Sequence, residues 1–400
     1  MGGGPDSWGE GQGLRPWPSP PAPLPTRIRG REGGACSPDF PAPTEREAVS
    51  PLTSPRLRGR GEWHYSPMIR PLLDFMTQRK KYLPLAGAIL LLAVAWVLPD
   101  SGLLNPYVVQ IMMYVGINMI LTLSLNLVNG YMGEFSVGHA GFMGIGAYVA
   151  SILTVAVLPR SWSPWLFPGV LLTGGLAAAA AGLIVAYPSF RTRGDYLAIV
   201  TLAFNMIVKS VLENIDALGG PRGYLGMPRL TNLFWVAAWV LITLTALRNL
   251  VHSNFGRGIM AIREDEMAAN LTSVDTRRLK LYAFLISAFF TGLAGGLYAH
   301  LLQFINPRSF SILKSTDMLV MVYLGGVGSL TGSLLGAAIF TVLMELLRFL
   351  GIWRWVVGPL LLVLLMIFRP QGLMGFKEAR WLRPAALFAG EGESVVDDKQ

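Results

Sequence analysis

Long apolar blocks follow one another through most of the chain, from Tyr82 to Phe368, with short polar connections between them. Most blocks reach the roughly 17–25 residues that a helix needs to cross the hydrocarbon core of a membrane. Only helices and closed barrels satisfy every backbone polar group in lipid, and a barrel would show alternating segments of about ten residues instead. The sequence therefore predicts an all-α polytopic membrane protein with about eight to ten transmembrane helices. The predicted spans are 82–98, 107–129, 141–158, 165–187, 196–212, 231–247, 282–305, the long stretch 317–349 and 355–368.

Composition supports a membrane protein and argues against several other classes. Hydrophobic residues make up 52% of the 400 residues and charged residues 14%, against about 25% charged in soluble globular proteins. A soluble enzyme, a disordered scaffold or a nucleic-acid-binding protein is a poor fit to these values. The single cysteine, Cys36, excludes a disulfide within the chain and a cysteine-based metal cluster. Neither a metal site nor a cofactor is expected.

The net charge of +9 is explained by membrane topology and does not need a nucleic-acid partner. Lys and Arg concentrate in connections on one side of the predicted helices, which the positive-inside rule assigns to the cytoplasm. The segments on that side are the one before Tyr82, the loops 130–140, 188–195 and 248–281, and the tail after Phe368. Because the tail is cytoplasmic, the stretch 317–349 must leave and return on the same side. It is predicted to form a hairpin or re-entrant pair bent around the sequence LGGVGSLTGS, 324–333.

The chain divides into three regions by composition. Residues 1–67 are rich in Pro and Gly and show no helical or strand period, so they are predicted to form a disordered arm. An equally weighted alternative is that translation begins at Met68, in which case this arm is not made. Residues 68–377 form the transmembrane domain, and residues 378–400 form a cytoplasmic tail.

Glycines recur at helical spacing within the apolar blocks. Gly328, Gly332 and Gly336 stand four residues apart, and Gly292 and Gly296 have the same spacing. Small residues at this spacing let helix backbones approach closely in lipid, so helix packing is the favoured interpretation. For the glycines of 324–333 a second interpretation stays open, because the ends of broken helices at membrane depth often line a substrate path.

The stretch NLVNGYMGEFSVGHAGFMGIGAY, 126–148, sets polar residues among glycines beside continuous apolar sequence. Ionisable groups at membrane depth are costly and usually face a cavity or a partner. Two interpretations stay open, a wet cytoplasmic turn with a buried, hydrogen-bonded His139 and a gate or cavity lining. A metal site is not expected, because no second His or carboxylate stands at ligand spacing from His139. The candidate pathway or gate residues are Asn129, Glu134, Ser136 and His139, with Gly325, Gly326 and Gly328 of the predicted bend.

The loop 248–281 is the longest polar connection between spans, and no GxxxxGK[ST] phosphate-binding motif occurs in the sequence. The loop carries a rough apolar stripe opposite a charged face, which predicts a short amphipathic helix on the cytoplasmic surface. The stripe consists of Ile259, Ile262, Met267 and Leu271. This helix either lies on lipid headgroups or presents Glu266, Ala268 and Ala269 to another protein. Asp275 is expected to cap the next span.

Several ordered blocks, between roughly residues 104 and 377, resemble the membrane-spanning permease subunit of branched-chain amino acid ABC importers. The blocks are NLVNGYMGEFSVGHAGFMGIGAY, YPSFRTRGDYLAIVTLAF, LGGPRGYLGMP, FGRGIMAIREDEMAAN, LISAFFTGLAGGLYA, MLVMVYLGGVGSLTGSLLGA and FRPQGLMG. The resemblance implies a multi-pass transport subunit of the bacterial inner membrane, not an enzyme. It further implies four kinds of partner: a second related permease, two cytoplasmic ABC ATPase subunits, an extracytoplasmic substrate-binding protein and the lipid bilayer itself.

The same resemblance assigns roles to individual residues. It identifies 256–273 as the coupling helix that meets the ATPase, and its residues are Gly256, Arg257, Arg263, Glu266, Ala268, Ala269 and Ser273. The RxRGD motif at a cytoplasmic span end matches Arg191, Arg193, Gly194 and Asp195. The chain departs from the family pattern at three places. Ser273 replaces a usual glycine, Glu134 replaces a common glutamine, and Asn205 and Met206 replace a glycine–glutamate pair.

The leading hypothesis is therefore an ATP-driven ABC importer permease for branched-chain, hydrophobic amino acids. An ion-coupled secondary transporter is the first alternative, because Glu134, His139 and the broken stretch 317–349 would suit one. An ABC permease for urea or short amides is the second alternative. No residue of the spans reads out a substrate side chain, so the exact substrate and its contacts stay open.

Overall fold

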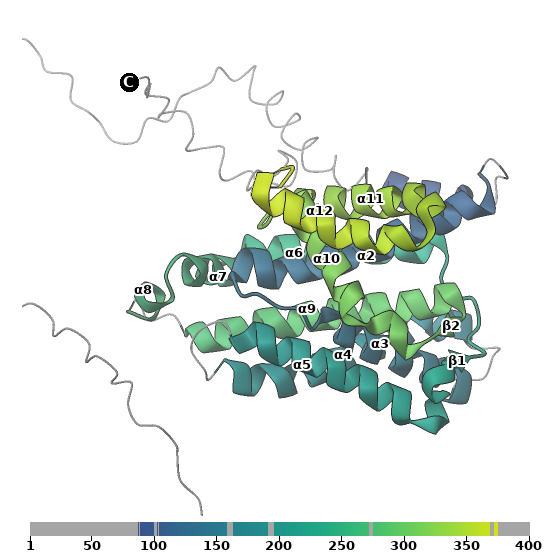
Figure 1. Cartoon of the computed structure of the whole chain (residues 1–400), viewed down its shortest axis with the longest axis horizontal. Coiled ribbons are helices and arrows are strands. Elements are labelled where there is room, and N and C mark those ends of the chain that lie inside the picture. The colour runs from purple at the N-terminus through teal and green to yellow at the C-terminus, as the bar shows by residue number, and fades with distance from the viewer. Residues whose placement is uncertain are drawn as a thin grey trace, which may run out of the picture. The chain divides into compact units, whose positions relative to one another are not determined.

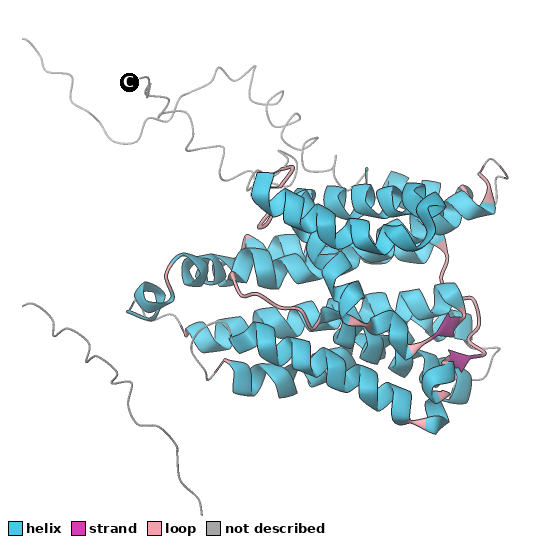
Figure 2. Cartoon of the chain, viewed as in Figure 1, coloured by secondary structure: helices cyan, strands magenta, loops and turns pink. Residues whose placement is uncertain are grey.

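The computed structural model describes residues 87, 89–99, 102, 104–157, 163–190, 196–271, 275–368 and 372–374. These residues belong to one of the two compact units of the chain, Tyr65–Gln400. They form a helical bundle with a single pair of very short strands (Figure 2). The predicted arm 1–67, the predicted tail 378–400, the motif residues 191–195 and Ser273 lie outside the described residues.

Within the described residues, seven helices are long and apolar enough to cross a membrane, which confirms the predicted all-α polytopic fold. They are α2, Pro106–Asn126, which continues as a π-helical turn to Met132; α3, His139–Ile152, which continues likewise to Val157; α4, Ser163–Ser189; α5, Tyr196–Asn214; α6, Leu233–Val251; α9, Thr276–Leu302; and α11, Leu330–Leu346, which continues as a 3-10 turn to Trp353. Shorter helices are α7, Asn254–Glu264, α8, Glu266–Leu271, α10, Ile312–Gly325, and α12, Arg354–Phe368. An apolar helical segment at 89–97 precedes α2.

Successive spans run in alternating directions, so the connections gather at two ends of the bundle (Figure 1). One end, which we call the loop end, carries the helices α7 and α8 and the start of the connection 133–138, which runs from there into the bundle to α3 (Figure 1). The opposite end carries β1, Tyr224–Leu225, and β2, Phe304–Ile305, which pair antiparallel. The positive-inside rule predicts that the loop end faces the cytoplasm.

The predicted bend near 324–333 is confirmed, and it separates α10 from α11. Gly326 and Gly328 there have φ angles of 123° and 76°, which glycine adopts at no steric cost. Ser329 caps α11, because its hydroxyl accepts a hydrogen bond of 3.0 Å from the Gly332 N–H. The start of α10 and the end of α11 both lie at the end of the bundle opposite the loop end. The chain thus leaves and returns on the same side, as the loop charges predicted.

Glycines bring the helix backbones of α3, α4 and α9 into direct contact. A Cβ atom added to Gly292 of α9 would lie 2.9 Å from the Gly174 carbonyl oxygen of α4 and closer still to the Ala178 side chain. A Cβ added to Gly146 of α3 would overlap the Gly292 backbone. The hairpin uses the same device, since a Cβ on Gly332 would lie 2.5 Å from a carbonyl oxygen of α10. Close packing at these glycines is therefore confirmed.

The span predicted at 282–305 begins earlier, because α9 starts at Thr276. The Asp275 side chain caps this start by accepting a hydrogen bond of 3.1 Å from the Arg278 N–H, as predicted. The basic residues after Asp275 lower the hydropathy of the first turns without interrupting the helix. Hydropathy locates the part of α9 that lies in lipid, whereas the cap locates its beginning.

Replacing Gly292 with Ala is expected to destabilise the bundle by about 1–3 kcal/mol, the usual cost of overpacking a close-packed interior. The measurement is the midpoint of thermal unfolding of the detergent-purified protein. Gly169→Ala in α4 is the matched control, because no described atom lies within 4 Å of the added Cβ there. Equal midpoints for the two variants would contradict the assigned packing role.

Candidate functional site

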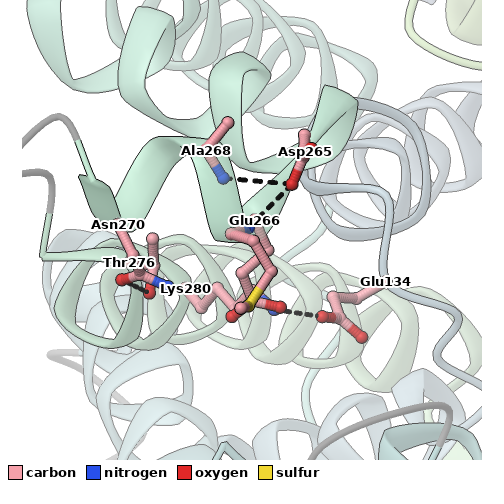
Figure 3. Close-up of polar contacts among 8 residues, drawn as sticks. Glu134, Asp265, Glu266, Ala268, Asn270, Thr276 and Lys280 are labelled. Atoms are coloured by element: carbon pink, nitrogen blue, oxygen red, sulfur yellow. Dashed lines mark hydrogen bonds and ion pairs between the residues drawn. The ribbon is translucent and has the colours of Figure 1, made fainter. Parts of the chain in front are cut away.

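The connection between α6 and α9 folds into two short helices, α7 and α8, in place of the single amphipathic helix predicted. Ser253 caps α7 by accepting a hydrogen bond of 3.3 Å from the Gly256 N–H. Asp265 has an extended backbone, with φ −158° and ψ 110°. Its side chain caps α8 by accepting hydrogen bonds from the N–H groups of Met267 and Ala268, at 2.8 Å and 3.1 Å (Figure 3). Asp265 thus ends one helix and begins the next, which is typical of aspartate.

The predicted apolar stripe holds only in α7. Ile259 and Ile262 are buried against the bundle, whereas Met267 and Leu271 of α8 are 65% and 88% exposed. The break at Asp265 turns α8 so that its apolar side chains point away from the bundle. An exposed apolar surface at the loop end is what either alternative, lipid headgroups or a docked protein, would need.

Lys280 of α9 joins this connection to the loop that follows α2. Its side chain is only 9% exposed, and its Nζ lies 2.5 Å from Glu134 Oε1 and 2.9 Å from Glu266 Oε2 (Figure 3). One cation therefore holds two carboxylates that come from separate segments. Because the lysine is nearly buried, these charge-assisted hydrogen bonds are stronger than an ordinary surface ion pair. We call Glu134, Glu266 and Lys280 the lysine bridge.

The lysine bridge unites two sites that the sequence suggested separately. Glu134 was a candidate gate residue and Glu266 a candidate coupling residue, and Lys280 belonged to neither set. The sequence separation between Lys280 and Glu134 is 146 residues, so no local pattern connects them. The one available signal was the position of Lys280 just before an apolar span. A lysine there needs a partner when the helix extends past its hydrophobic part.

The other predicted coupling residues have identifiable local roles. Gly256 lies so close to the backbone of Val251 that an added Cβ would overlap it. Arg257 donates a hydrogen bond to the Asn254 side chain within the first turn of α7. Further along, Ala269 is buried while Ala268 is exposed.

Arg263 connects α7 with the loop that carries Glu134. A Cβ atom added to Gly133 would lie 2.9 Å from Cγ of Arg263, so the arginine stem covers that glycine. Gly133 has a φ of 79°, which favours glycine independently of this contact. The loop after α2 therefore contacts the connection between α6 and α9 at two points, the Arg263 side chain and the lysine bridge.

The candidate gate residues next to Glu134 form an internal hydrogen-bond network. His139 is 1% exposed, with its two ring nitrogens 3.2 Å from Ser136 Oγ and 2.8 Å from Ser287 Oγ. Ser287 donates in turn to the Ser124 carbonyl oxygen at 2.6 Å, and Asn129 accepts from the Ser136 N–H at 3.2 Å. The network links α2, α3 and α9. This arrangement corresponds to the first of the two interpretations that the sequence left open, a buried, hydrogen-bonded His139.

Asn126 at the end of α2 anchors the glycine bend of the hairpin. Its Nδ2 donates to the Ser329 carbonyl oxygen at 3.0 Å and to Ser333 Oγ at 2.7 Å. Its Oδ1 accepts from the Gly328 N–H at 3.0 Å. An added Cβ on Gly130 would lie 2.5 Å from the Gly328 nitrogen. The structure thus brings together the two candidate gate segments, the polar stretch after α2 and the glycines of the bend.

Known proteins similar to this chain are membrane permeases. A family model described as "Branched-chain amino acid transport system / permease component" matches residues 107–369. The high-affinity branched-chain amino acid transport system permease protein LivM of Escherichia coli (strain K12) is 35% identical over 341 residues, covering 76% of this chain and 77% of that protein. The LivH permease protein of the same organism is 23% identical over 282 residues, covering 65% and 91%. A probable LivM of Methanocaldococcus jannaschii is 26% identical over 323 residues, covering 66% and 92%. No solved structure matches significantly.

Replacing Lys280 with Met is expected to loosen α8, because Glu134 and Glu266 would then share a site without a cation. Charged hydrogen bonds contribute about 1.5–3 kcal/mol, so amide hydrogen exchange in α8 should accelerate by about tenfold or more. Glu134→Gln keeps a neutral acceptor and should have a smaller effect. Lys209→Met is the control, since its ion pair with Glu213 is longer, at 3.9 Å, and more exposed. Similar exchange in α8 of the Lys280 and Lys209 variants would refute the role given to the lysine bridge.

Proposed function

Because this chain belongs to the branched-chain amino acid transport permease family, we propose that it is the permease subunit of an ATP-driven importer for branched-chain, hydrophobic amino acids. As a multi-pass inner-membrane protein of this family, it is a transport subunit and not an enzyme. Its role in the proposed importer is to form the path for the substrate and to receive the motion that ATP hydrolysis produces.

The observation that carries the ATP-driven mechanism is the arrangement of α8. Its exposed side chains Met267 and Leu271 offer an apolar contact surface at the loop end. The neighbouring Glu266 is held by Lys280 of α9, the span that packs against both α3 and α4. A partner protein that moved α8 would therefore also act on α9, at the centre of the bundle, through the ion pair between Glu266 and Lys280.

The proposed partners follow from the family and from the sequence. The 400 residues contain no phosphate-binding motif of the GxxxxGK[ST] type, so ATP would be hydrolysed by separate subunits, two cytoplasmic ABC ATPases. The chain is similar to both LivM and LivH, two permease proteins of one organism with the same transport-system name. We therefore propose pairing with a second, LivH-like permease. An extracytoplasmic binding protein would deliver the amino acid at the end that carries β1 and β2.

Uptake driven by ATP is expected when the chain is assembled with its partner subunits in membrane vesicles. The measurement compares accumulation of labelled L-leucine after ATP depletion with accumulation after collapse of the ion gradients. Uptake that is lost on ATP depletion but survives collapse of the ion gradients would support the proposal. Uptake that survives ATP depletion but not gradient collapse would identify an ion-coupled secondary transporter instead.

Replacing both Met267 and Leu271 with Asp is expected to abolish co-purification of the ATPase subunits, because the apolar contact surface of α8 is then charged. The control is Leu225→Asp in β1, which alters an equally exposed apolar residue, 66% exposed, at the opposite end. Both variants should insert normally into the membrane. Undiminished ATPase binding by the double variant would contradict docking through α8 and leave contact with lipid headgroups as the alternative.

A further inference from the structure

A cavity of about 540 Å³ opens at the end of the bundle opposite to the loop end, between α2, α10 and α11. This size suits a small ligand together with some water, since ligand sites commonly span about 300–1,000 Å³. The residues that matter for its chemistry are Asn118 of α2, Lys314, Asp317 and Met321 of α10, and Phe340 and Met344 of α11. The cavity therefore combines charged and apolar walls within one membrane-embedded site.

One wall carries a lysine that is held in position. Lys314 Nζ donates to Asn118 Oδ1 at 3.1 Å, and Asn118 Nδ2 donates to Thr341 Oγ1 at 2.9 Å. These two hydrogen bonds join α10, α2 and α11. They use one of the three donor positions of the ammonium group, so Lys314 can still bind an anionic group in the cavity.

Asp317 stands three residues after Lys314 and lines the same cavity. It forms no hydrogen bond or ion pair with any other residue that the structure describes, and it is half-buried. Carboxylates at membrane depth are costly and normally pair with a partner or face a ligand pathway. The cavity thus presents a cation and an anion that attract one another across one helical turn without forming an ion pair, and the carboxylate of Asp317 keeps its hydrogen-bonding capacity for a ligand.

The charges at the rim of the cavity differ from this pair, because they satisfy one another. Arg348 donates to the Tyr107 hydroxyl at 3.0 Å and to Glu345 Oε1 at 3.1 Å, and Tyr107 also donates to Glu345. These three residues form a network, and Arg354, which also lines the cavity, interacts electrostatically with Glu345 of that network. A charged ligand would therefore find its partners deeper in the cavity, at Lys314 and Asp317.

The remaining wall is apolar. Met321 and Phe340 line it although only 1% and 3% of their surface is exposed, and the half-buried Ile111 and Met344 are its more accessible apolar side chains. Methionine side chains are flexible and polarisable, so they adapt to branched aliphatic groups of slightly different shape. A wall of this kind would accept several related apolar side chains and would not select one.

We propose that this cavity is a binding site for a zwitterionic α-amino acid with an apolar side chain. The ligand carboxylate would accept a hydrogen bond from Lys314, its ammonium group would donate to Asp317, and its side chain would pack on Met321, Phe340 and Met344. A separated cation and anion suit a zwitterion, whereas urea or a short neutral amide would leave both charges unpaired. The assignment rests on the proposed importer function and adds the residues that contact its substrate.

The first experiment tests binding directly, on the assembled transporter without its binding protein. Met344→Cys is introduced together with Cys36→Ser, which leaves this chain with one thiol, and its modification by a small thiosulfonate reagent is followed by mass spectrometry of the chain. L-Leucine should slow the modification several-fold. Leucinol, which lacks the carboxylate, and 4-methylpentanoate, which lacks the ammonium group, should not. Asp317→Asn should remove the protection by L-leucine.

The matched control is Leu225→Cys in the same background, an exposed site outside the cavity whose modification should not respond to L-leucine. Equal modification of Met344→Cys with and without L-leucine, in a complex that transports L-leucine, would overturn the site and leave the importer function standing. A Met344→Cys thiol that never reacts in the complex would show that the cavity is closed to small solutes there, which also overturns the site.

The second experiment measures uptake of L-leucine by the complete transporter. Asp317→Asn and Lys314→Gln should each reduce uptake by about tenfold, as expected for loss of one charged hydrogen bond to the substrate. The controls Glu213→Gln and Lys209→Gln remove an ion pair of α5, outside the cavity, and should leave uptake unchanged. Normal uptake in both cavity variants would refute the proposal. A transporter with unaltered sequence that takes up no L-leucine would instead refute the importer function itself.

Discussion

The direct contact of helix backbones at glycines is the constraint on which the rest of this structure depends. In lipid there is no hydrophobic force between helices, so association relies on close packing and interhelical hydrogen bonds. Gly146, Gly174 and Gly292 let α3, α4 and α9 touch, and Gly332 does the same for α10 and α11. Since α9 is fixed by these contacts, the polar side chains that it carries are fixed as well. Ser287 can then meet the buried His139, and Lys280 can meet its two carboxylates.

The two asparagines of α2 tie the α10–α11 hairpin to the bundle at both of its ends. Asn126 binds the glycine bend, and Asn118 binds Lys314 and Thr341 near the opposite end. Beyond Asn126, α2 continues through its π-helical turn to Glu134 of the lysine bridge. The lysine bridge thus links α8 and α9 to the segment that follows α2, and α2 itself extends from there to the cavity. A movement of α8 therefore has a physical route to the proposed substrate site, through the lysine bridge and then along α2.

The sequence predicted features that depend on local chemistry and missed those that depend on distant contacts. Apolar length predicted the spans, glycines predicted the bend at 324–333, and Asp275 was recognised as a helix cap. Asp265 was missed, because a hydropathy period does not register a side chain that caps the following turn. Lys280, Lys314 and Asp317 were also missed, since each obtains its meaning from residues on other helices or from a cavity. Those neighbouring residues come together only in the folded protein.

Lys280 and Lys314 illustrate how charged groups in a membrane protein divide between structure and a proposed role in transport. Lys280 faces two carboxylates and is satisfied within the protein, so its contribution is to hold α8 against α9 and the loop after α2. Lys314 has a single hydrogen-bond partner, the amide of Asn118, and Asp317 has no hydrogen-bond or ion-pair partner among the described residues, although it interacts electrostatically with Lys314. An unsatisfied charge in a low-dielectric site destabilises the protein until a ligand arrives. A zwitterionic ligand that gave hydrogen bonds to both groups would therefore gain affinity by relieving the cost of their incomplete pairing.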